Sequence, residues 1–175
     1  MAGSLRRLHS LLPETVQKLR SILLENNLKV MAISAHYNMA YEYVNKLHWW
    51  DNSRSGGPIV EQATHFLDLM RYIASVSSGE KATPDPHSMQ ALTVEHDEQV
   101  GILGKLNIDE SMLDPDNRIP RVASAQFIFA NNGVIGNLTH VVGLHGATLY
   151  DTHIEATADG WIFSLRNLYA ERPQL

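Results

Sequence analysis

The sequence predicts an α+β domain in which an open, antiparallel-rich sheet carries helices packed on one face. Its first half contains two amphipathic helical patterns, over residues 13–27 and 58–74, with a short apolar run of strand length between them. Its second half contains four β-rich runs in succession, joined in pairs by Asn-Gly and Asp-Gly dipeptides, which are strong hairpin signals. Helices followed by consecutive hairpins are typical of this fold class.

The first helix and the first strand follow from the spacing of apolar residues. Pro13 suits a first helical turn because the amide it lacks would be unpaired there, and Asn26-Asn27 is a stop signal. Residues 29–37 then form an apolar run with two β-branched members, which indicates a buried strand, and 40–46 can add a short helix. The helical spacing in the first segment is carried by Val16, Leu19, Leu23 and Leu24.

The stretch 49–72 organises the centre of the chain. A polar, aromatic loop over 47–55 runs into a helix that Gly57 can cap and whose first turn suits Pro58. Four polar side chains recur on this helix at offsets of four, three and four, which puts them in one stripe: Glu61, His65, Asp68 and Tyr72. An apolar stripe lies beside it, made of Ile59, Ala63, Phe66, Met70 and Ile73. One face is therefore expected to hold the helix on the core and the other to be free for chemistry.

The second half predicts strands and turns. A strand is expected over residues 88–95, and the Asp- and Pro-containing segment 98–120 is expected to be an ordered loop with a short turn. Two hairpins follow. The first joins 122–130 to 134–142 through Asn131-Asn132-Gly133, and the second joins 148–158 to 161–166 through Asp159-Gly160.

The composition narrows the classes of function. With 175 residues and 44% apolar content, the chain is expected to form one soluble core. A net charge of -5 and a pI near 5.9 argue against binding of nucleic acid or anionic lipid through bulk charge. The chain has no cysteine, so disulfides and thiolate chemistry are excluded and the cytoplasm is the expected compartment. The apolar content of residues 1–12 is too small for a signal peptide or a membrane span.

His65 is the leading candidate for chemistry. With Glu61 one turn earlier, its imidazole can be oriented by a carboxylate, which suits a general acid or base near neutral pH. The alternative is an ordinary Glu-His pair on a solvated helix face. Trp49 and Trp50 can stack on a planar ring or a sugar face, or simply pack over the start of the helix. Asp68 can hydrogen-bond a substrate or be polar surface.

Other chemistries have less support. Glu61 and His65 could ligate a metal together, but no HExxH motif occurs among the nine histidines, and no metal ligand is assigned. A GxGxxG turn is absent, so the sequence contains no dinucleotide-binding motif. A GxSxG motif is also absent, which leaves acyl transfer without a nucleophile.

The central stretch resembles a family signature. The run GGPIVEQATHFLDL over residues 56–69 is similar to the GG...D...H..D signature of the glucose-fructose oxidoreductase / inositol dehydrogenase family, often written Gfo/Idh/MocA. The order of elements also resembles the C-terminal α/β domain of that family: a helix, a strand, a Trp-rich loop, the signature helix and then hairpins. The resemblance covers residues 13–166.

The resemblance implies a role for each candidate residue. His65 would be the acid/base group or the partner of a substrate hydroxyl. Glu61 stands where the family usually has Asp, so a carboxylate is kept on a side chain one methylene longer. The substrate contacts would be Tyr37, Trp49, Trp50 and Asp68.

The resemblance also implies that this sequence lacks the family's N-terminal domain. In the family an N-terminal Rossmann domain holds NAD or NADP, while the C-terminal domain contacts a sugar or polyol and forms homo-oligomers through its sheet. Residues 1–27 would then carry the terminal helix left over from a Rossmann-type domain, and 28–175 would be the C-terminal domain. The family's Glu-Lys-Pro is replaced by the sequence RRLH, and Arg7 cannot shuttle a proton at neutral pH. We therefore expect a fragment that binds no cofactor alone and is inactive or weak.

Two other functions stay open at this point. The first is a non-enzymatic dimerisation or sugar-binding module, with no nucleic-acid or membrane partner. The second is a metal-dependent hydrolase centred on Glu61 and His65. Cofactor titration, sizing chromatography and metal analysis would separate these functions from an oxidoreductase half.

Overall fold

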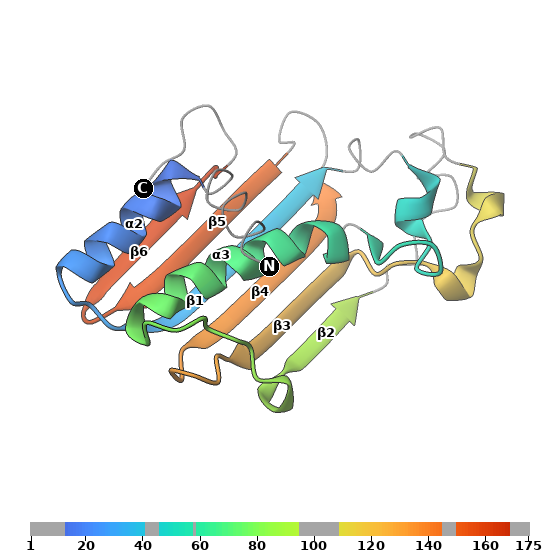
Figure 1. Ribbon diagram of the computed structural model, residues 1–175. Coiled ribbons are helices and arrows are strands. Elements are labelled where there is room, and N and C mark those ends of the chain that lie inside the picture. Colours follow the sequence, from blue (N-terminus) through green and yellow to red (C-terminus); the bar gives the residue numbers. More distant parts are fainter. Residues whose placement is uncertain (1–12, 41–45, 58, 95–108, 145–149, 169–175) are drawn as a thin grey trace, which may run out of the picture.

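In the part of the chain that the structure describes, one sheet with two α-helices on the same face forms the body (Figure 1). The computed structural model describes residues 13–40, 46–57, 59–94, 109–144 and 150–168. Within these ranges six strands form a single sheet in the order β2-β3-β4-β1-β5-β6. In chain order their bounds are Val30–Ala40 (β1), Gln90–Val94 (β2), Val122–Ile128 (β3), Ile135–Leu144 (β4), Tyr150–Ala158 (β5) and Trp161–Arg166 (β6). The predicted fold class is confirmed.

The described strands are antiparallel to their neighbours except at the centre of the sheet. There β1 pairs in parallel with β4, with Ala32 opposite Ile135, and antiparallel with β5 on its other side. The hairpins β3–β4 and β5–β6 form where the sequence predicts them. Asp159 and Gly160 both have positive φ, 36° and 84°, as a two-residue turn between twisted strands requires. The earliest described strand therefore lies between two later hairpins.

The helices α2 (Glu14–Glu25) and α3 (Thr64–Ala74) pack side by side on the sheet. Arg20 joins them, because its Nη1 donates to the Tyr72 carbonyl and to Ser75 Oγ, the latter at 2.8 Å. α2 thus shares a core with the later elements, and the domain division expected after residue 27 stays a prediction. No helix in the part of the chain that the structure describes is long and apolar enough to cross a membrane. The residues that the two helices bury are Val16, Leu19, Leu23, Phe66, Leu69, Met70, Ile73 and Ala74.

The main difference from the predicted elements lies at the start of the second helix. The spacing predicts an α-helix from residue 58, but Ile59–Ala63 (η3) form a π-helical turn and α-helical geometry begins only at Thr64. A π-helical turn is wider than an α-helical turn, and apolar spacing of 3.6 residues does not reveal it. The wide turn follows two glycines, which leave the backbone free to enter it.

Smaller differences concern the segments around the central helix. β1 runs to Ala40, where the sequence predicts the start of a short helix, and residues 41–45 of that helix lie outside the described ranges. One 3₁₀ turn, Leu47–Trp50 (η2), lies in the stretch predicted to be an irregular loop. The described part of 98–120 contains two short turns, Glu110–Met112 (η7) and Pro115–Asn117 (η8), as expected for an ordered loop.

Gly57 fixes how the chain enters the π-helical turn. Its φ is +68°, and an added Cβ would lie 2.8 Å from Ile119 Cγ2 and 3.1 Å from the Trp49 carbonyl oxygen. Its amide donates to Ser55 Oγ at 2.9 Å. Both the backbone conformation and the available space therefore require glycine here.

We predict that Gly57→Ala destabilises the protein more than Gly79→Ala. Gly79 has the same φ of +68°, but no atom lies within 4 Å of its added Cβ, so alanine there costs only the left-handed conformation. That cost is about 1 kcal/mol, and the clash at Gly57 should raise the total to about 3 kcal/mol. Urea denaturation of the two variants measures the difference. Equal losses would show that the contact with Ile119 relaxes freely.

Candidate functional site

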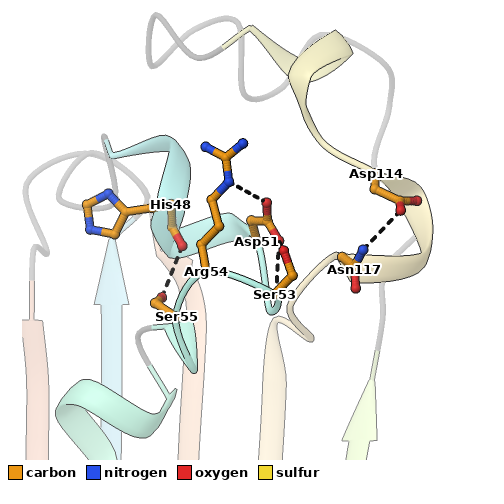
Figure 2. A network of polar contacts seen from close by, with 7 residues as sticks. All are labelled: His48, Asp51, Ser53, Arg54, Ser55, Asp114 and Asn117. Atoms are coloured by element: carbon orange, nitrogen blue, oxygen red, sulfur yellow. Dashed lines mark hydrogen bonds and ion pairs between the residues drawn. The ribbon is translucent and has the colours of Figure 1, made fainter.

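The loop before the π-helical turn is built around a buried carboxylate (Figure 2). Asp51 is only 6% exposed; its Oδ1 accepts hydrogen bonds from the Ser53 amide at 2.9 Å and the Ser53 hydroxyl at 2.6 Å. Its Oδ2 forms an ion pair with Arg54 Nε at 3.0 Å. The hydrogen bond from the Ser53 hydroxyl lowers the pKa of Asp51, against the opposing effect of burial. Asp51 therefore stays ionised at neutral pH and holds the loop in a tight turn.

A second segment braces this loop from the side of β3. The Asn52 amide donates to the Asn117 carbonyl at 2.7 Å, and the Ile119 amide donates to the Trp50 carbonyl at 3.3 Å. Figure 2 shows Asp114 closing the neighbouring turn η8, where its Oδ2 accepts from Asn117 Nδ2 at 2.9 Å. The loop is thus anchored to a segment that lies more than sixty residues later in the chain. This anchoring fixes the entry to η3.

The aromatic candidates divide between the core and the surface. Trp50 is 2% exposed, with the Arg121 guanidinium 5.7 Å from its ring centroid, and Tyr37 is 6% exposed. Tyr37 stacks on Phe66 with 5.0 Å between the ring centroids. Trp49 is half-buried and keeps part of its surface accessible. Tyr37 and Trp50 therefore contribute to the core, and contacts of these three rings with a substrate stay predictions.

The polar stripe runs along η3 and α3. Glu61 and His65 are exposed, and within the described residues no hydrogen bond or ion pair joins them. Asp68 Oδ1 accepts a hydrogen bond from Arg71 Nη1 at 3.0 Å. The Tyr72 ring lies against α2, with the Arg20 guanidinium 4.6 Å from the ring centroid. Because residues seven apart share a helix face, His65 lies on the same flank as Tyr72. Asp68 and Tyr72 thus have intramolecular partners, while Glu61 and His65 face solvent.

A buried histidine that the sequence does not single out lies beneath the π-helical turn. His140 on β4 is 1% exposed, and its Nε2 lies 3.4 Å from Oε1 of Gln62 on η3. Its ring centroid lies 5.2 Å from that of Tyr37. Burial lowers the pKa of His140 to about 4, so the ring is neutral at pH 7. Strand alternation is the signal for this position, since His140 shares the covered face of β4 with Leu138 and Val142.

A pair of histidines lies on the opposite face of the sheet. His36 on β1 and His153 on β5 stack with their ring centroids 6.1 Å apart, and His153 Nε2 lies 2.8 Å from Ser164 Oγ. Burial, together with the nearby Arg166, lowers the pKa of His153. In the described ranges no group of three or more His, Asp or Glu side chains is placed to hold a metal ion.

The chain has relatives in sequence that are longer than it is. A protein-family model described as "Putative oxidoreductase C terminal domain" matches residues 12–161. An uncharacterised protein of Schizosaccharomyces pombe is 42% identical over 158 residues, which are 90% of this chain and 37% of that protein. A second S. pombe protein is 37% identical over 156 residues, covering 89% of this chain and 38% of its own length. The chain thus spans less than two fifths of the curated relatives it matches.

Solved structures share the fold at low sequence identity. A scyllo-inositol dehydrogenase from Lactobacillus casei, solved with bound NAD(H) and scyllo-inositol, superposes with a TM-score of 0.60 at 13% identity, covering 93% of this chain and 40% of that one. GenD2 from gentamicin A biosynthesis, solved with NAD, gives 0.59 at 12%, covering 88% and 37%. A super-repressor mutant of Gal80p from Saccharomyces cerevisiae gives 0.57 at 12%, covering 86% and 37%. At these identities the likeness shows the fold alone.

We predict that His140 makes the protein less stable as the pH falls from 7 to 5. An unfolded histidine titrates near 6.5 and the folded one at about 4, so between these values the unfolded state binds a proton that the folded state does not. The contribution of the neutral, buried His140 to the free energy of unfolding is fully present above pH 6.5 and is lost as the pH falls toward 4. At pH 5 the loss due to His140 is about 2 kcal/mol.

Urea denaturation at pH 7 and pH 5 tests this prediction. His140→Gln should remove about 2 kcal/mol of the pH dependence, while His87→Gln, which changes an exposed histidine, should leave it intact. The same pH dependence in all three proteins would contradict a neutral, buried His140.

Proposed function

This chain belongs to the family of oxidoreductase C-terminal domains of the Gfo/Idh/MocA type, and we propose that it forms the substrate-binding part of an NAD(P)-dependent oxidoreductase acting on a sugar or polyol CH–OH group. Support comes from the solved relatives, one of which carries NAD(H) and scyllo-inositol and another NAD. The sequence itself has no GxGxxG turn, so its own residues do not fit a dinucleotide. The nucleotide, which supplies hydride chemistry when bound, would be held by another part of the longer protein.

The observation that carries the proposal is the exposed His65 on a helix whose entry is rigidly fixed. An imidazole nitrogen can accept the proton of a substrate hydroxyl near neutral pH and return it in the reverse direction. Glu61, exposed one turn earlier, can orient that imidazole when substrate is bound. The Asp51 loop and Gly57 would set the position of both side chains, which suits a group that must meet a reacting atom within a fraction of an ångström.

The substrate contacts would come from the same end of the fold. Trp49 is half-buried, with Lys46 Nζ 5.1 Å from its ring centroid, and can stack on a sugar face. Asp68 is half-exposed beside Arg71 and can accept a hydrogen bond from a hydroxyl. Tyr37 and Trp50 would contribute from the core by shaping the wall behind these groups.

We predict that His65→Ala in the full-length protein lowers kcat by about 10²–10⁴-fold and leaves the Kd of NAD(P) nearly unchanged. Steady-state kinetics with a polyol and fluorescence titration with NAD(P)H measure the two quantities. His87→Ala, which alters an exposed histidine on Pro86–Ser88 (η5), is the matched control and should change neither. An equal loss of turnover and cofactor affinity would mean that His65 is structural.

A non-enzymatic module is the second candidate, and the likeness to Gal80p favours it. Gal80p, described as a super-repressor in its mutant form, shares this fold, and a fold alone does not determine function. A full-length protein that binds NAD(P) yet reduces no NAD(P)⁺ with any sugar or polyol tested would support this candidate. Turnover that depends on His65 would exclude it.

We also propose that the uncovered face of the sheet binds a second copy of the chain. Strand alternation places several exposed apolar side chains there, from 43% to 77% exposed. The centre of this face is polar, with Ser124 Oγ 2.9 Å from Thr139 Oγ1. The exposed apolar side chains lie toward the edges of the sheet, on both sides of this polar centre, and exposed apolar surface of this kind marks protein interaction sites. The exposed apolar residues on this face are Leu92, Val94, Ile128, Ile135 and Ile162.

We predict that Ile135→Lys shifts the protein from dimer to monomer, because an unpaired ammonium would have to be desolvated in the interface. Size-exclusion chromatography with light scattering measures the mass at several concentrations. Met112→Lys places the same charge on an exposed side chain of η7, outside the sheet, and should leave the dimer intact. A monomeric unmodified protein, or dissociation of both variants alike, would contradict this interface.

A further inference from the structure

The π-helical turn at the start of the second helix has a specific contact with the sheet below it. η3 contains one residue more per turn than α-helix would allow, and such turns are uncommon and recur at functional sites. Gln62 lies within the turn, and its Oε1 lies 3.4 Å from Nε2 of the buried His140 on β4. This contact joins the turn to the middle of a strand 78 residues later in the chain.

The chemistry of the two groups sets the direction of the hydrogen bond. With Oε1 of Gln62 facing the ring at 3.4 Å, and since an amide oxygen can only accept, this arrangement favours the tautomer in which Nε2 of His140 carries the proton and donates it. His140 is 1% exposed and burial lowers its pKa, so its imidazole is neutral at pH 7 and has one proton to place. Among the groups that face this ring, Tyr37 and Gln62 are uncharged at neutral pH.

Two other hydrogen bonds of the turn are local. The Thr64 hydroxyl donates to the Val60 carbonyl within the helix, and the Val60 amide donates to the Gly56 carbonyl at a long 3.4 Å. Both bonds are local and would survive a change from a π-helical to an α-helical turn. The contact from Gln62 to His140 is different, because it reaches the sheet and depends on the direction in which Gln62 points.

The width of the turn decides the relative directions of the residues on either side of it. Removing one residue from the turn would rotate everything before it by about 100° around the helix axis relative to α3. Glu61 lies in the turn and His65 lies just after it, so their relative directions depend on this choice. Gln62 points inward to His140 while Glu61, its neighbour, is exposed.

We infer that His140 is a positioning residue: with its proton on Nε2, it holds Gln62 and the π-helical turn, and so sets where Glu61 stands relative to His65. The importance given to Glu61 and His65 rests on the proposed function. The positioning itself is a property of the folded chain and needs neither cofactor nor substrate.

Nuclear magnetic resonance of the unmodified chain at pH 7 gives the first test. The ring nitrogen shifts of His140 should show a neutral imidazole protonated on Nε2 and bare at Nδ1. A proton on Nδ1, or a charged ring, would overturn the inference without any variant having to fold.

Variants give the second test, through hydrogen exchange of the backbone amides of residues 62–66. Gln62→Leu removes the acceptor and should raise exchange at least about tenfold, and His140→Leu should do the same. His140→Gln keeps a donor and should restore exchange to within about threefold of the unmodified protein. Gln90→Leu makes the same change on the exposed strand β2 and is the matched control.

The outcomes separate this inference from the proposed function. Unchanged exchange in Gln62→Leu, or equal exchange in His140→Leu and His140→Gln, would overturn the positioning role. If His65→Ala lowers the turnover of the full-length protein, Gln62→Leu should lower kcat at least about tenfold with the Kd of NAD(P) unchanged, and full turnover despite raised exchange would also overturn the positioning role. If His65→Ala keeps full turnover, the proposed function fails while the exchange and tautomer results still decide the positioning.

Discussion

The pairing of β1 with strands on both of its sides is the constraint on which the rest of the structure depends. β1 joins the hairpin β3–β4 by parallel pairing and the hairpin β5–β6 by antiparallel pairing, and so turns two separate hairpins into one sheet. Its covered face presents Ile33, Ala35 and Met39 to the helix layer, each at most 1% exposed. Isolated hairpins are marginally stable in water, so neither would persist without this strand.

The same strand connects the sheet to the candidate site. Tyr37 on β1 lies between Phe66 of α3 and His140 of β4, which ties the first α-helical turns to two neighbouring strands. The loop that enters the helix is held separately, by Asp51 and by the segment before β3. His65 is therefore exposed on a backbone that is fixed from below and from its N-terminal side.

Local rules located the elements of this fold, and long-range packing decided the details that they missed. The Asp159-Gly160 turn and the amphipathic helices depend on residues within a few positions of one another, so the sequence predicts them well. The central position of β1 in the sheet depends on pairing with strands far along the chain. The spacing of apolar residues within a segment carries no information about such pairing. The π-helical turn was missed because the helical pattern assumes 3.6 residues per turn.

The candidate site divides in the same way. Spacing predicts that Glu61, His65, Asp68 and Tyr72 share a stripe, but not that Arg71 and α2 occupy its C-terminal half. Alternation along β1 and β4 contains the information that Tyr37 and His140 are buried, because each lies two residues from an apolar core position. Trp50 is buried with the guanidinium of the sequence-distant Arg121 5.7 Å from its ring centroid, a contact that no local pattern predicts.

The parallel contact between β1 and β4 also has a kinetic consequence. Its partners, such as Ala32 and Ile135, are separated by roughly a hundred residues, whereas each hairpin closes over a short turn. Hairpins form in about 1–10 μs, but the central pairing must first overcome the entropy of closing a long loop. We therefore expect the pairing of β1 with β4 to be the slow step of folding, with both hairpins only marginally stable until β1 joins them. Until that step is complete, both hairpins expose unpaired edges that can recruit other chains.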